Sequence, residues 1–121
     1  MKVIIDLIED IREEIGNQED FVVTAMLLKE HPEDADKLSY AGEAPLNLFT
    51  VVDGKRKLIF KIDGSQNIIT VGELVKHLLI LPMDAMMYEV RMDVNAAYSD
   101  MEIVGFGKSM EEKKYILFIR I

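Results

Sequence analysis

The sequence predicts an α+β domain in which two amphipathic helices pack on one face of an antiparallel sheet, or sheets, of about six strands. Two observations lead to this fold class. Two segments, near residues 4–15 and 71–79, carry apolar residues at helical spacing, and each is followed by three short apolar runs typical of strands. Helices and strands do not alternate one by one, so a parallel sheet built from β-α-β units is not expected.

The length and composition predict a single globular domain over residues 1–121. Half of the residues are hydrophobic and 30% are charged, which is the balance of a folded protein rather than a disordered one. A chain of 121 residues can bury a core without disulfides or a structural metal.

The first helix is expected near the start of the chain. Its apolar residues recur at steps of three and four, while its acids lie mostly on the other side. Gly16 and Asn17 supply the stop signal. The apolar stripe consists of Ile4, Leu7, Ile8, Ile11 and Ile15.

Three strands should follow this helix. Residues 21–28 are apolar on both faces, which predicts a central or covered strand. Residues 46–52 and 57–62 flank Asp53-Gly54, a strong hairpin signal. Residues 29–45 between them are expected to form a long polar loop, although the segment could also contain the end of one strand and the start of the next.

The second helix and the last three strands repeat this order. Thr70 and Glu73 have the spacing of a capping box, and Pro82 ends the helix that follows. Strands are expected over residues 88–94, 101–106 and 115–121. The final strand is apolar to its last residue, so it should be either central or paired across a dimer interface, and we expect a homodimer.

The order αβββαβββ suggests an internal duplication with half-repeats 1–63 and 64–121. Residues 6–11 can be aligned with residues 73–78, and residues 58–62 resemble residues 117–121. The alternative is that any two amphipathic helices and any two hydrophobic strands look alike. If the duplication holds, two αβββ halves would pack about a pseudo-twofold axis.

The charge distribution excludes several classes of function. Residues 1–43 hold twelve acids and four bases, which accounts for the whole net charge of −8. Nucleic-acid binding is not expected, because phosphate contacts require clustered Lys and Arg. Membrane association is not expected either, and no apolar run is long enough to span a bilayer. An acid at position 6 interrupts any signal peptide, so we expect a cytoplasmic protein.

The leading hypothesis is a non-enzymatic interaction protein, such as a regulator, an inhibitor or an immunity-type factor. Its acidic N-terminal third would bind a basic protein partner. Carboxylates four residues apart on one helix repel each other mildly, and a solvated helix face is the alternative explanation for them. The predicted contact residues are Glu9, Asp10, Glu13, Glu14, Glu30, Glu33, Asp34 and Asp36.

The rival hypothesis is a small-molecule-binding or enzymatic domain with a pocket between the second helix and the sheet. Methionine suits adaptable binding surfaces, although it fills core gaps more often. The predicted pocket residues are His77, Met86, Met87 and Tyr88. No catalytic residue, metal site or cofactor is expected, because the chain has no cysteine and no histidine pair with zinc-ligand spacing. A purely structural, self-assembling protein is a third hypothesis.

Overall fold

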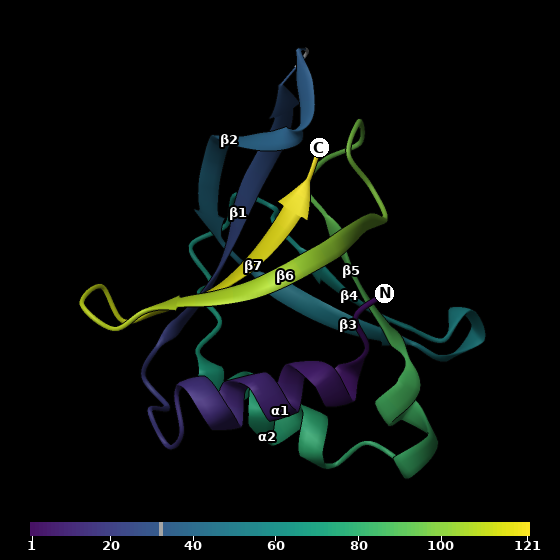
Figure 1. Cartoon of the computed structure of the whole chain (residues 1–121). Coiled ribbons are helices and arrows are strands. Elements are labelled where there is room, and N and C mark those ends of the chain that lie inside the picture. Colours follow the sequence, from purple (N-terminus) through teal and green to yellow (C-terminus); the bar gives the residue numbers. More distant parts are fainter. Residues whose placement is uncertain (32) are drawn as a thin grey trace.

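A computed structural model of the whole chain describes residues 1–31 and 33–121 (Figure 1). Two helices lie on the same side of a curled, half-barrel sheet of seven strands. The α+β class with two amphipathic helices is confirmed. The elements are α1 (Ile4–Glu14), β1 (Val22–His31), β2 (Asp34–Pro45), β3 (Leu48–Val52), β4 (Lys57–Lys61), α2 (Val71–Leu79), β5 (Glu89–Asp93), β6 (Met101–Ser109) and β7 (Lys114–Arg120), with short 3-10 turns η1 (Asp53–Lys55) and η2 (Met83–Met87).

The sheet is mixed, which corrects the prediction of purely antiparallel pairing. Its strand order is β2-β1-β7-β6-β5-β4-β3, and the pairs β1–β7 and β4–β5 are parallel. The second parallel pair is produced by a β-α-β unit, because α2 carries the chain from the end of β4 back to the start of β5. One such crossover among antiparallel neighbours does not produce the regular alternation by which parallel sheets are recognised in a sequence.

The seventh strand is β2, which lies within the segment that we expected to be a loop. Residues 29–45 form the end of β1 and all of β2, paired as an antiparallel hairpin. Strand β1 pairs with β7 only as far as Leu28, which lies opposite Arg120. The rest of the hairpin is therefore a two-stranded ribbon that projects beyond the sheet (Figure 1). Most of residues 29–39 are polar, so this segment lacks the alternating apolar pattern that marks a half-buried strand.

The last strand, β7, lies inside the sheet, between β1 and β6. We expected from its apolar sequence that this strand is either central or paired across a dimer interface, and the structure shows it in a central position. The edges of the sheet are β2 and β3, so an exposed edge of β7 gives no reason for dimerisation. The homodimer stays a prediction.

The beginnings of the two helices are tied to the sheet by equivalent backbone hydrogen bonds. The amide of Ile4 donates to the carbonyl of Tyr88 at 3.0 Å, and the amide of Val71 donates to the carbonyl of Phe21 at 2.8 Å. The first residue of α1 is thus bonded to the residue before β5, the strand that follows α2. The first residue of α2 is bonded to the residue before β1, the strand that follows α1. Val71 lies 67 positions after Ile4, and Tyr88 lies 67 positions after Phe21. A duplication would produce this arrangement, and the duplication itself stays a prediction.

A buried asparagine holds the link between β4 and α2. The Asn47 side chain is 6% exposed and lies between β2 and β3. Its amide nitrogen donates to the carbonyls of Ser65 and Asn67 at 3.1 and 2.8 Å. Its oxygen accepts from the backbone amides of Asp63 and Gly64 at 2.8 and 3.3 Å. One side chain thereby satisfies four backbone groups of residues 63–67.

We predict that Asn47→Ala lowers the free energy of unfolding by roughly 2–3 kcal/mol, because four backbone groups of residues 63–67 lose a hydrogen-bond partner and a buried side chain is removed. Urea unfolding followed by circular dichroism measures this change. Asn67→Ala is the matched control, since the Asn67 side chain is exposed and only its backbone carbonyl takes part in the network. Equal losses in the two variants would contradict the role assigned to Asn47.

Helix α1 is fixed to the sheet by a buried tyrosine. The hydroxyl of Tyr115, on β7, donates to the Asp10 carboxylate at 2.6 Å, and the Tyr115 side chain is fully buried. Burial raises the pKa of Tyr115 far above its ordinary value of 10.0, and the hydrogen bond to Asp10 raises it further. Above pH 10 the hydroxyl therefore stays protonated in the folded protein, whereas the same hydroxyl in an unfolded chain would lose its proton.

We predict that the stability provided by Tyr115 is complete below pH 10 and is lost as the pH rises above it. The slope is at most about 1.4 kcal/mol per pH unit for this group. Tyr115→Phe should cost about 1 kcal/mol at pH 7 and should reduce the alkaline loss. Urea unfolding at pH 7 and pH 11 measures both effects. Tyr98→Phe, which changes an exposed side chain, is the control; an identical pH profile in both variants would rule out the assignment.

Candidate functional site

The predicted acidic residues do not form one surface. In Figure 1 the residues on α1 lie at one end of the molecule, whereas the β1–β2 hairpin projects from the opposite end. Glu33 is exposed in the turn of this hairpin. The side chains of Glu30, Asp34 and Asp36 lie outside the part of the structure that is described. The two elements that carry the predicted acids, α1 and the β1–β2 hairpin, are therefore separated in space.

Two of the four predicted acids on α1 have internal partners. Asp10 accepts the Tyr115 hydroxyl, and Glu14 forms an ion pair with Lys108 at 2.7 Å. Glu9 and Glu13 are exposed, and no side chain in the described part of the chain pairs with them. They lie one helical turn apart on the solvent face of α1. The structure thus divides the four acids into two that stabilise the fold and two that face solvent.

Basic residues from the neutral part of the sequence neutralise other acids of the first third. Lys113 pairs with Asp20 at 3.1 Å, and Lys114 pairs with Glu43 at 3.2 Å. Lys114 also contacts Glu112 at 2.7 Å, and the hydrogen bonds to Glu112 and Glu43 raise the pKa of its ammonium group. The segregation of charge along the sequence is therefore weaker on the folded surface.

The four residues predicted to line a pocket have different environments. The Tyr88 hydroxyl donates to Asp53 at 2.9 Å, which raises the pKa of this largely buried tyrosine. Met86 packs against the core, while Met87 is exposed. The His77 ring is exposed, with Nδ1 at 2.8 Å from the Glu73 carbonyl and its plane edge-on to Phe49. Neither of the two cavities described below is lined by any of these four residues.

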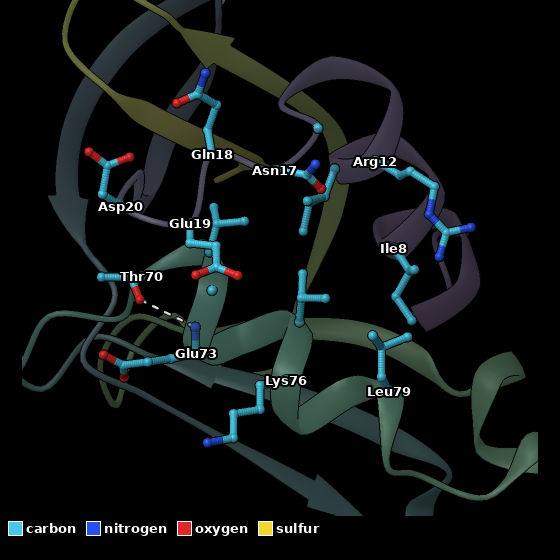
Figure 2. Close-up of a pocket in the computed structure, with 15 residues that line it drawn as sticks. Ile8, Arg12, Asn17, Gln18, Glu19, Asp20, Thr70, Glu73, Lys76 and Leu79 are labelled. Carbon is cyan, nitrogen blue, oxygen red and sulfur yellow. Dashed lines mark hydrogen bonds between the residues drawn. The ribbon is translucent and has the colours of Figure 1, made fainter.

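The larger cavity is a groove of about 720 Å³ between α1 and α2, closed at one end by residues 16–20 (Figure 2). We name it the interhelical groove. Its apolar lining is Ile8, Ile11, Val71, Val75 and Leu79, and its polar and charged lining includes Arg12, Glu19, Asp20, Glu73 and Lys76. The volume is within the range of ligand-binding pockets. Val75 and Leu79 belong to the apolar residues at helical spacing in residues 71–79, and this spacing does not distinguish a groove lining from a core contact.

The closed end of the groove depends on Gly72. A Cβ atom at this position would lie 2.9 Å from Cβ of Glu19 and 3.1 Å from its carbonyl oxygen, so only glycine allows this approach without a shift. The Gly72 amide donates to the Glu19 carbonyl at 3.0 Å, and the Glu73 amide donates to the Thr70 hydroxyl at 3.3 Å. These amides at the beginning of α2 are therefore already engaged within the protein.

Charged side chains around the groove are unevenly distributed. Figure 2 shows Glu19, Asp20 and Glu73 near the closed end, with Arg12 on the α1 side beside Ile8. Asp20 is paired with Lys113, whereas Glu19 and Glu73 make no ion pair with any described side chain. The closed end thus carries two unneutralised carboxylates.

A second, smaller cavity of about 370 Å³ lies where β1 and β2 meet the beginning of β7. The Thr24 hydroxyl and the ion pair between Glu43 and Lys114 line it. Thr24 donates to Glu43 at 3.2 Å, so these polar groups satisfy one another. This arrangement holds the hairpin against β7.

Among the side chains that the structure describes, no three His, Asp or Glu residues are grouped so as to hold a metal ion. The described helices are all too short and too polar to cross a membrane. No protein-family model matches the sequence, and no curated protein or solved structure matches it either.

Proposed function

We propose that this protein is a non-enzymatic interaction protein that binds a basic protein partner through the solvent face of α1. The observation that supports the proposal is the pair Glu9 and Glu13, which are exposed on one helical face with no cation paired to them in the described part of the chain. Like charges at this spacing destabilise a helix by about 0.2–0.5 kcal/mol. A partner carrying Lys or Arg would relieve this repulsion and gain favourable Coulomb energy.

The neighbouring acids strengthen this choice of surface. Asp10 and Glu14 keep α1 in place through Tyr115 and Lys108, so the exposed pair is presented on a fixed helix rather than on a loop. A fixed helix loses little conformational entropy when a partner binds. The projecting β1–β2 hairpin, with Glu33 exposed in its turn, is proposed as a second acidic contact.

We predict that the double reversal Glu9→Lys with Glu13→Lys abolishes capture of the partner by the tagged protein. The experiment is a pull-down from native lysate at 50 mM and 500 mM salt, with the captured proteins identified by mass spectrometry. Exposed charge pairs are screened by salt, so capture by the unmodified protein should also fall at the higher concentration.

The matched control is Glu102→Lys with Glu111→Lys, which changes the net charge equally at two exposed positions, on β6 and in the β6–β7 turn. This control should capture the same basic protein as the unmodified chain. An equal loss of capture in both double variants would mean that net charge, rather than the surface of α1, controls capture, and it would overturn the proposed surface. Unchanged capture after the α1 reversal would overturn it as well.

A further inference from the structure

The interhelical groove continues into an exposed apolar surface at its open end. Leu79, at the end of α2, is 56% exposed. Beyond it, Ile80 and Met83 are 80% and 87% exposed, and Met87 is 61% exposed. Helix α1 packs against η2, which holds these methionines near the beginning of α1, and residues 16–20 close the groove at the other end of α1 (Figure 1). The segment that carries these exposed apolar residues therefore lies at the end of the groove opposite residues 16–20.

The acidic side chains of the groove lie at its closed end, opposite the end at which the exposed apolar residues lie. Glu19 and Glu73 lie at the closed end without ion-pair partners among the described residues. Arg12 lies further toward Ile8 and Leu79, and Lys76 extends away from α1 (Figure 2). The exposed Glu9 and Glu13 follow on the solvent face of α1. The groove lining thus carries two carboxylates and two cations that make no ion pair with any described side chain, and the two carboxylates lie together at the closed end.

The walls of the groove favour a helical occupant over an extended one. Both walls are helices whose backbone groups bond within the helix, so they offer no free edge to which an extended peptide could add as a strand. Recognition must then use side chains. Apolar side chains at positions i, i+3, i+4 and i+7 of a helix form a stripe that fits a groove between two helices.

We propose that the interhelical groove binds an amphipathic helix of the basic partner, with the basic residues of that helix at the end held by Glu19 and Glu73. This inference rests on the proposed function and adds to the solvent face of α1 a second contact, the groove, together with the form of the ligand. The N-terminal end of a helix carries a partial positive charge and the C-terminal end a partial negative one. The bound helix therefore begins at Glu19 and Glu73, and it runs past Arg12 toward Leu79 and the methionines.

The test uses synthetic helices as probes for the full-length protein. The first probe is a peptide of about 14 residues, or ~21 Å as a helix, with leucines at i, i+3, i+4 and i+7 and lysines in its first half. The second has the same composition with the leucines spread over all faces. The third has the lysines in its second half. Affinity is measured by calorimetry, and the contact surface by chemical-shift changes of the protein amides.

The expected result is that the first peptide binds most tightly and shifts the amides of Ile8, Val75 and Leu79. Leu79→Asp should weaken its binding by about tenfold, as loss of a central apolar contact does at other interfaces. Met110→Asp, which changes an exposed methionine of the β6–β7 turn, should leave binding within about twofold. Circular dichroism checks that both variants fold.

Two results separate the possible failures. If the peptides with and without a leucine stripe bind equally, or if the shifts map to the β1–β2 hairpin, the groove is not the site while an acidic contact surface remains. If no basic peptide binds, and the Glu9→Lys and Glu13→Lys reversal changes nothing in the lysate experiment, the proposed function fails as well. Equal affinity for the first and third peptides would overturn the direction assigned to the bound helix.

Discussion

The reciprocal anchoring of the two helices is the constraint on which the rest of the structure depends. Ile4 is hydrogen-bonded to Tyr88, and Val71 to Phe21, so each helix begins against the strand that follows the other helix. This exchange places α1 and α2 side by side on one face of the sheet. The interhelical groove and the parallel pairs β1–β7 and β4–β5 belong to the same arrangement, because strands from the two halves of the chain become neighbours.

Local patterns in the sequence predicted the elements better than their pairing. The helical periodicity located α1 and α2, and the Thr70 cap is confirmed by its bond from the Glu73 amide. The pairing between strands was not predicted: Leu58 is paired with Val90 and Tyr115 with Val23, and both parallel pairs join the two halves of the chain. Register is set by contacts between strands distant in the chain, and two hydrophobic strands can be slid by two residues without changing their pattern.

The candidate site was less predictable because its properties depend on partners far away in the sequence. Glu13 and Glu14 are adjacent acids, yet among the described side chains only Glu14 pairs with a lysine, which lies 94 positions along the chain. Val75 and Leu78 share one apolar stripe, but Leu78 is fully buried while Val75 lines the groove beside α1. The composition of residues 1–43 identifies them as acidic. Only the fold shows which of their carboxylates have internal partners and which face solvent.

The exchange of strands between the halves also determines what a single half could do on its own. Residues 1–63 alone would leave β1 without β7 and β4 without β5, and residues 64–121 alone would leave β7 without β1 and β5 without β4. The connection between them runs through the segment that Asn47 holds by hydrogen bonds rather than through a shared strand. If the chain were divided between residues 63 and 64, each fragment would therefore expose the strand edges that the other fragment covers in the intact protein.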